Sequence, residues 1–220
     1  MYKKLLFIAL ASMMLVGCKG PQPLGPTPEE HVYTITEEQY NSEFASYKFF
    51  DIGSNVTVNM TLNMSDYDVN GVHIVVKADN GRYYDTNDSD YSETFYNYLG
   101  TEEDGRYRFQ EYYREKDGDY EKHITKVSLK EFIRMEICII MPDFSLLQFD
   151  EQKQCYMTKE LVSDGEIINK LFYEEMYFVD GQLSKALIKI YDDEDPQKLE
   201  GEVEQEYSEY GKTRVIIPNV

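Results

Sequence analysis

Residues 55–64 read NVTVNMTLNM, and this stretch decides the expected fold. Val56, Val58, Met60, Leu62 and Met64 occupy alternate positions, and Asn or Thr fills the positions between them. Successive side chains of a strand point to opposite faces of a sheet, so this alternation predicts a strand with one buried and one solvated face.

Alternating segments continue on the C-terminal side of this stretch. Asn80-Gly81 and Asp180-Gly181 are dipeptides typical of tight hairpin turns, and Asp117-Gly118-Asp119 is another turn signal. Tyr210-Gly211-Lys212 predicts a last turn, which joins a closing pair of strands. The pattern therefore predicts antiparallel hairpins with strands at 55–64, 72–78, 82–84, 92–99, 107–115, 120–127, 146–149, 154–161, 171–179, 182–191, 201–210 and 213–217.

Two capping boxes predict two helices among these strands. Thr36 and Gln39 begin a helix expected from Glu37 to about Tyr47, and Ser128 and Glu131 begin a second one that ends near Pro142. The fold class is thus mainly β with a few helices, an α+β arrangement. The apolar residues of the second helix include Leu129, Phe132, Ile133, Ile137 and Ile140.

Length and charge limit the function. The 220 residues carry 22 Lys and Arg against 41 Asp and Glu, a formal net charge of −19. Such acidity disfavours nucleic acid, whose binding depends on clustered Lys and Arg, and it disfavours a basic patch on anionic headgroups. Nothing in the sequence calls for a cofactor.

The N-terminus has the features of an export signal. Lys3 and Lys4 precede an apolar run from Leu5 to Val16, which as a helix covers about 18 Å, short of the roughly 30 Å bilayer core. A basic start, a short apolar run and a small residue at the cut are typical of a cleaved signal.

The tetrad Leu15-Val16-Gly17-Cys18 resembles the lipobox of bacterial lipoproteins. That resemblance implies cleavage before Cys18, diacylglycerol on its thiol and an acyl chain such as palmitate on the new terminus. Residues 1–17 are then a signal peptide, residues 18–30 a lipidated, proline-rich tether of roughly 30 to 40 Å, and residues 31–220 a single β-rich domain. We expect a lipid anchor on the outer face of the cell membrane, or on the outer membrane of a Gram-negative host.

The other two cysteines leave two alternatives open. Cys138 and Cys155 are an even pair in an extracytoplasmic setting, where a disulfide persists, or they are two separately buried thiols. No Cys-x-x-Cys spacing supports a metal or redox site.

The order of elements resembles a set of lipoproteins of low-GC Gram-positive bacteria. The resemblance is carried by the segments 143–145, 149–156 and 177–183, which read DFS, FDEQKQCY and YFVDGQL. These proteins look like distant members of the superfamily that contains the carriers LolA, LprG and LppX. The resemblance implies a curved, unclosed antiparallel β-sheet covered on its concave face by short helices, with a cavity for acyl chains.

Two interpretations of the apolar face therefore stand. It is a closed core, or it lines a cavity that binds a hydrophobic small molecule or lipid, since apolar pockets and adaptable Met side chains suit such ligands. The candidate cavity residues are Val56, Val58, Met60, Leu62, Met64, Phe132, Ile133, Ile137 and Ile140.

Catalytic and metal signatures are weak. His31, His73 and His123 lie far apart in the sequence, and no serine stands in a Gly-x-Ser-x-Gly elbow. Residues 85–90 begin like a calcium loop but lack its Gly and Glu, so an acidic turn is the simpler interpretation. We expect neither an enzyme nor a metal site.

Tyrosine is the unusual residue, with 20 copies and no Trp. Tyr is a favoured strand residue that packs its ring, but an exposed set would bind glycan or protein by stacking. The leading hypothesis is a non-enzymatic, membrane-anchored lipoprotein that carries an apolar ligand, and the alternative is a surface adhesion or scaffold module. The tyrosines concerned are Tyr83, Tyr84, Tyr91, Tyr96, Tyr98, Tyr107, Tyr112 and Tyr113.

Overall fold

The structure is a computed structural model and describes seven stretches of the chain. These are residues 31–44, 52–65, 69–88, 91–128, 142–163, 169–192 and 195–220. All of them except His31 belong to one compact unit, Val32–Val220. The predicted signal peptide, the lipobox, the tether and the helix predicted at 129–140 lie outside the described residues.

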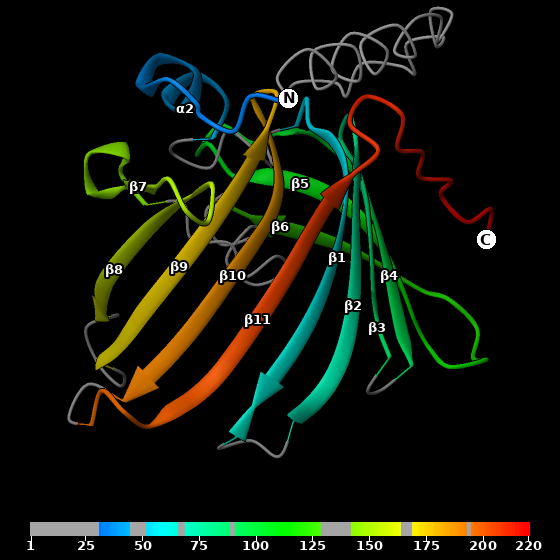
Figure 1. Cartoon of the computed structure of the whole chain (residues 1–220). Helices are drawn as coiled ribbons and strands as arrows, with labels where there is room; N and C mark the ends of the chain where they lie inside the picture. The colour runs from blue at the N-terminus through cyan, green and yellow to red at the C-terminus, as the bar shows by residue number, and fades with distance from the viewer. Residues whose placement is uncertain are drawn as a thin grey trace, which may run out of the picture. The chain divides into compact units, whose positions relative to one another are not determined.

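The described elements are one α-helix, one 3₁₀ helix and eleven strands, and all the strands belong to one sheet (Figure 1). Their bounds are α2 Glu37–Glu43, β1 Asn55–Met64, β2 Val69–Asp79, β3 Arg82–Asn87, β4 Ser92–Thr101, β5 Tyr107–Glu115, β6 Glu121–Val127, η3 Phe144–Leu146, β7 Gln148–Asp150, β8 Cys155–Ser163, β9 Asn169–Val179, β10 Gln182–Asp192 and β11 Leu199–Ser208.

The sheet consists of two antiparallel meanders joined by a single long-range pairing. Its strand order is β6-β5-β4-β3-β2-β1-β11-β10-β9-β8-β7, so β6 and β7 are the two edges and the sheet is unclosed. β1 pairs with β11 from Thr57↔Ser208 to Met64↔Gly201. The predicted mainly β class and the unclosed antiparallel sheet are confirmed.

Local signals placed most of the turns correctly. Asn80 and Gly81 have φ values of 49° and 85°, and Asp180 and Gly181 have 52° and 80°. Two successive positive φ values define the type I′ turn, whose twist matches that of the flanking strands. Both predicted hairpins are therefore confirmed.

The predicted closing strand, 213–217, is wrong. β11 already pairs with β10 on one side and with β1 on the other, so it has no free edge for another strand. Residues after Gly211 instead cross the end of β1: Thr57 and Thr213 hydroxyls lie 3.0 Å apart, and the Val215 amide donates to Asp79 Oδ2 at 3.1 Å. Smaller corrections are that β2 begins at Val69, before the predicted position, and that Leu146 lies in η3.

The capping box of the first helix is present as predicted. Thr36 Oγ1 accepts from the Gln39 amide at 3.1 Å, and Gln39 Oε1 accepts from the Thr36 amide at 3.2 Å. α2 is shorter than predicted, since it ends at Glu43. The predicted cover of the concave face by helices remains a prediction, because the second helix lies outside the described residues.

The hydrophobic core lies on one face of the sheet. It contains residues of strands as distant in the sheet as β5 and β8, for example Phe109 and Tyr156. Side chains so far apart in strand order meet only where a sheet curves around them. This face is therefore concave, as the curl of β5 and β6 behind the front strands in Figure 1 shows.

Candidate functional site

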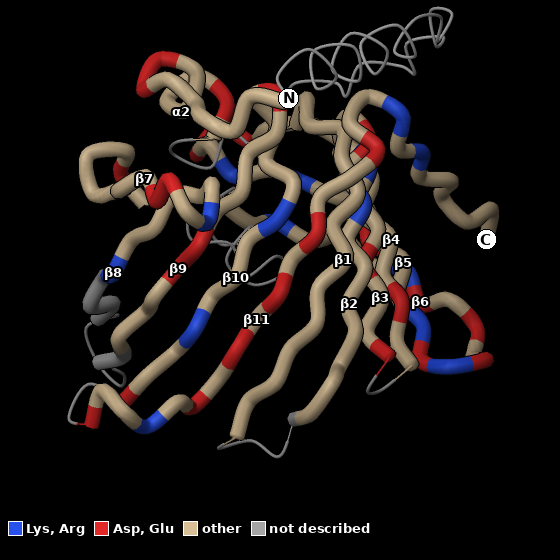
Figure 2. Tube along the Cα trace, in the orientation of Figure 1, with Lys and Arg blue, Asp and Glu red and all other residues tan. Residues whose placement is uncertain are grey.

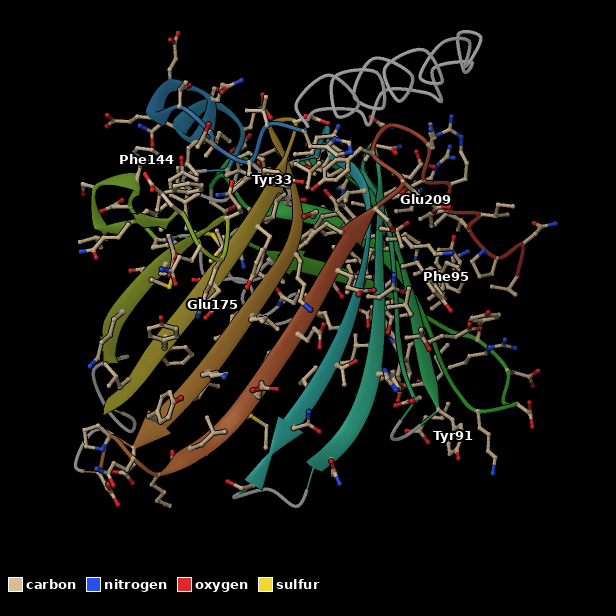
Figure 3. All side chains as sticks on the ribbon, viewed as in Figure 1. Tyr33, Tyr91, Phe95, Phe144, Glu175 and Glu209 are labelled. Carbon is tan, nitrogen blue, oxygen red and sulfur yellow. The ribbon has the colours of Figure 1, made fainter. Side chains whose placement is uncertain are left out.

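One end of the concave face is a filled aromatic core. We call it the near end; it lies beside α2, at the β9–β10 turn. Tyr40 and Phe44 of α2 are fully buried against Phe178, with ring centroids 6.3 and 5.3 Å from it. The Tyr40 hydroxyl donates to the Pro142 carbonyl at 2.8 Å, and the Phe144 ring lies 5.4 Å from the Tyr40 ring. Figure 3 labels Phe144 close to α2.

The candidate cavity residues of β1 run away from this core. Val56, Val58 and Met60 are buried, whereas Leu62 and Met64 are half-buried. For these three buried residues the closed-core interpretation describes the structure. The other four candidates, Phe132, Ile133, Ile137 and Ile140, lie outside the described residues.

The opposite end of the face, which we call the far end, is apolar and less enclosed. Its side chains come from β1, β2, β9 and β10, where the register aligns Met64, Gly201, Ile190 and Phe172 in one row. Leu62 opposes Val72 in the next row. The half-buried residues of the far end are Leu62, Met64, Val72, Phe172 and Ile190.

A surface pocket of about 280 Å³ opens at the far end, where β1 stops and β11 starts. Gly201 is close-packed there, since a Cβ on it would lie 2.3 Å from Met64 Sδ. The absence of a side chain at Gly201 therefore lets Met64 cross the strand pair. The pocket is lined by Asn63, Met64, Ser65, Asn70, Leu199, Glu200, Gly201 and Glu202.

A set of buried polar side chains lies on the same face, in the rows of Val58, Met60 and Leu62. We call it the polar layer: Thr158, Glu174, Gln205 and Tyr207. Thr158 of β8 stands directly opposite Glu174 of β9, and their exposed fractions are 7% and 5%. Gln205 is fully buried; its Oε1 accepts from the Tyr207 hydroxyl at 2.7 Å, and its Nε2 lies 3.4 Å from Met60 Sδ.

The polar layer contains one unsatisfied atom. Among the described residues, no hydrogen-bond partner lies within reach of the buried Thr158 Oγ1. Burial, and then the charge of Glu174, raise the pKa of Tyr207 well above its usual range, so its hydroxyl stays protonated. The layer therefore places a carboxyl group, an amide and two hydroxyls inside an apolar face.

The sequence interpretation missed this layer, although a signal for it exists. Phe172, Met176 and Phe178 occupy alternate positions of β9 and therefore lie on the same face of the strand. Glu174 lies on that face too, between these apolar residues. Gln205 interrupts the phase of Val203 and Tyr207 in β11 in the same way. A charged or amide residue on the buried face of a strand is a polar group that needs hydrogen-bond partners inside the protein.

The eight tyrosines singled out in the sequence are mostly packed. All eight are described, and of these Tyr83, Tyr96 and Tyr112 are buried, whereas Tyr91 alone is fully exposed, at 65%. Tyr91 lies in the connection between β3 and β4, directly before Ser92, and away from the near end (Figure 3). This burial favours a packing role for these tyrosines over a stacking platform.

The convex face carries a cross-strand ladder of aromatic rings between two lysines. Successive register pairs place Lys77, Tyr84, Phe95, Tyr112 and Lys122 in one row across β2 to β6. Lys77 Nζ lies 5.8 Å from the Tyr84 ring and Lys122 Nζ 5.2 Å from the Tyr112 ring. Cation–π contacts of this kind stabilise the sheet surface.

Glu93 connects this ladder to the β5–β6 turn. Its carboxylate accepts from Arg114 Nε and from the Tyr120 hydroxyl, and it receives a longer bond of 3.4 Å from Tyr84. Desolvation, together with the Glu93 charge, raises the pKa of Tyr120 to about 12. The cluster is fully paired and needs no ligand.

Ion pairs cover the convex face of β8 to β11. Lys185 pairs with Glu204 and Lys189 with Glu202, and Figure 2 shows acidic residues along β11 beside basic ones on β10. Glu175 pairs with Lys153 at 2.5 Å and accepts from Tyr177 at 2.7 Å. These exposed pairs are worth little individually and keep this face solvated.

Cys155 is a fully buried free thiol beside Glu175 and Tyr177. Burial, and then the Glu175 charge, raise its thiol pKa, which makes it a weak nucleophile. The disulfide with Cys138 was one of two alternatives; Cys155 is not in a disulfide in this structure, and Cys138 lies outside the described residues.

The described residues contain no group of three or more His, Cys, Asp or Glu arranged to hold a metal ion. Asp85 to Asn87 of the calcium-like stretch are strand residues of β3. His73 contacts Thr61 on β1, and His123 contacts Glu121 on β6. The two histidines belong to separate surface contacts.

Within the described part of the chain, none of the helices has the length and apolar character required to cross a bilayer. Comparison of this chain with protein-family models, with curated proteins and with solved structures gives no match. The function must therefore be argued from the concave face itself.

Proposed function

We propose that this protein is a membrane-anchored extracytoplasmic lipoprotein that binds a lipid-like ligand, without catalysis, on the concave face of its sheet. The anchor is the lipidated Cys18, and the ligand site is the far end. The observation that carries the proposal is the half-buried apolar surface of Leu62, Met64, Val72 and Ile190, which continues beyond the filled core.

The physical reason is that the far end combines apolar surface with incomplete burial. Each buried methylene contributes about 0.8 kcal/mol, so an acyl chain laid on this surface binds favourably. Met64 adds an adaptable lining, since Met side chains change conformation at low cost. At the near end the three rings of Tyr40, Phe44 and Phe178 are buried against one another.

The test is native mass spectrometry of Lys19–Val220 purified from a lipid-containing host, followed by lipid extraction and uptake of a fluorescent fatty acid. We expect a bound mass of lipid size. Leu62→Asn should lower uptake at least about tenfold, because a polar amide replaces apolar contact surface.

The matched control is Thr61→Asn, on the opposite face of the same strand, which should bind like the native protein. Circular dichroism checks that both variants stay folded. Protein that is free of lipid and also fails to take up the fluorescent probe would refute ligand carriage. Equal uptake by the two folded variants would mean that the ligand does not bind at the far end.

A further inference from the structure

The five strands β2 to β6 separate their charged side chains by face. Successive residues of a strand point to opposite faces, so the register assigns each residue to the convex or the concave side. All six Lys and Arg residues of these strands occupy convex positions, together with only two carboxylates. The basic residues are Lys77, Arg82, Arg108, Arg114, Lys122 and Lys126, and the two carboxylates are Asp79 and Glu93.

The concave positions of the same five strands carry the opposite charge. They contain four carboxylates, and these described strands place no Lys or Arg there. A chain with a formal net charge of −19 therefore presents a basic surface on one side of β2 to β6, which we call the basic face. The concave carboxylates are Asp85, Glu111, Glu115 and Glu121.

Half of the cations on the basic face are available to a partner. Glu93 and Glu102 form ion pairs with the other three. No ion pair between described residues includes Lys77, Arg82 or Lys122, and the last two side chains are exposed. The convex side of β10 and β11 differs, because its lysines are paired with glutamates across the strands.

An exposed apolar residue lies among these cations. Ile124 is 53% exposed and stands between Lys122 and Lys126 on the convex side of the edge strand β6. Lys77 and Lys122 are four strand spacings apart, about 19 Å, so the charges are spread over an area. Basic residues around exposed apolar ones are typical of surfaces that lie on anionic membranes.

We infer that the basic face is a docking surface for an anionic lipid bilayer. The inference rests on the proposed anchor, which keeps the domain beside the membrane and makes the bilayer the anionic surface within reach. The net charge of the chain predicts repulsion, but the Debye length is about 8 Å at physiological ionic strength, so at contact the headgroups interact mainly with the nearest face. Each Lys or Arg near an anionic surface raises the affinity about fivefold.

The experiment measures sedimentation of Lys19–Val220, which contains the whole compact unit, with vesicles of equimolar phosphatidylglycerol and phosphatidylcholine. This fragment has no acyl anchor, so binding reports on the folded domain. We expect binding to these vesicles and much weaker binding to phosphatidylcholine alone. Raising the ionic strength from about 0.1 to about 1 M should release the protein, because the Debye length falls from about 10 to about 3 Å.

Two double variants separate the basic face from the overall charge. Arg82→Gln with Lys122→Gln removes two unpaired cations and should weaken binding to the anionic vesicles at least about tenfold. Lys185→Gln with Lys189→Gln, on the convex side of β10, is the matched control: it changes the net charge equally and should bind like the native protein. Circular dichroism checks folding, and uptake of the fluorescent fatty acid should be native in both variants.

A fluorescent reporter locates the contact. The chain contains no Trp, so a single introduced Trp gives the only indole signal. The emission of Ile124→Trp should shift to shorter wavelength when the anionic vesicles are added. Leu146→Trp, in η3 and 49% exposed before substitution, is the control and should show no shift.

The outcomes separate this inference from the proposed function. Failure to bind the anionic vesicles, equal binding to both vesicle types, equal losses in the two double variants or equal emission shifts at the two positions would each overturn the docking surface. None of these results changes the tests of ligand carriage, which measure bound lipid and fatty-acid uptake. A domain that docks as expected but takes up no fatty acid would support the basic face and refute ligand carriage alone.

Discussion

The near and far ends of the concave face are built on the same strands but differ in packing. At the near end, α2 and its C-cap place Tyr40 and Phe44 against Phe178, and these three rings are buried. At the far end, the same face of β1 continues as Leu62 and Met64, which remain half-buried. One end is a closed core, and the other has half-buried apolar side chains, on which we propose that the ligand binds.

The difference shows that apolar residues can alternate regularly along a whole strand without all of them being buried in the core. The alternation of β1 is equally regular from Val56 to Met64, yet burial changes between Met60 and Leu62. The polar layer coincides with this change, since Gln205 stands opposite Met60 in the sheet. Three experiments, which change the sequence or the pH, test this difference in packing between the near and far ends.

The largest expected effect is a contrast between two truncations. Phe178→Ala should lower the free energy of unfolding by about 3 to 5 kcal/mol, because it leaves a cavity in an enclosed core. Leu62→Ala at the far end should cost only about 1 to 2 kcal/mol, since its side chain is already partly solvated. Urea denaturation measures both free energies of unfolding, provided that the dependence of the free energy on urea concentration is the same in the native protein and the variants. Equal costs would mean that the two ends are packed alike.

The next effect is a loss of stability in alkali that comes from two buried tyrosine hydroxyls. Burial raises the pKa of Tyr207 and of Tyr210, whose hydroxyl donates to the Leu183 carbonyl at 2.5 Å. Their protonated forms are favoured in the folded state, so this stability is complete below the unfolded Tyr pKa of about 10 and is lost as pH rises above it.

For Tyr207 the loss approaches about 1.4 kcal/mol per pH unit above that value. Chemical denaturation at stepped alkaline pH measures it, with phenolate absorbance followed in parallel. Tyr207→Phe should flatten the profile. A native protein whose stability does not change in this range would contradict the burial of these two hydroxyls.

The smallest expected effect concerns the close packing at the pocket of the far end. Gly201→Ala places a Cβ 2.3 Å from Met64 Sδ, so the flexible Met side chain must move, at a cost of about 1 kcal/mol. The methyl resonance of Met64 should shift. Gly53→Ala is the control, because nothing lies within 4 Å of that position. An unmoved Met64 resonance would show that the pocket is looser than described.

Much of the local structure was predictable from short-range patterns. The bounds of β1 and β5 were predicted to the residue, and both Asx-Gly hairpins and the Thr36 capping box were confirmed. The closing strand at 213–217 was predicted wrongly, because its alternation resembles a strand but no sheet edge remains beside β11. The polar layer was missed because Glu174 looks like any surface Glu until its phase is compared with Phe172 and Met176.

By itself, the sequence determined where most strands lie, where the chain turns and which face of each strand is apolar. These depend on side-chain alternation, turn residues and caps, which act over a few neighbouring positions. The signal peptide and lipobox around Cys18 are a prediction from the sequence alone. The tertiary structure alone decided that β1 pairs with β11, that Tyr40 packs against Phe178, and that Thr158 stands opposite Glu174. Such contacts join residues from distant parts of the chain, and they depend on how the sheet curves and on which edges remain free.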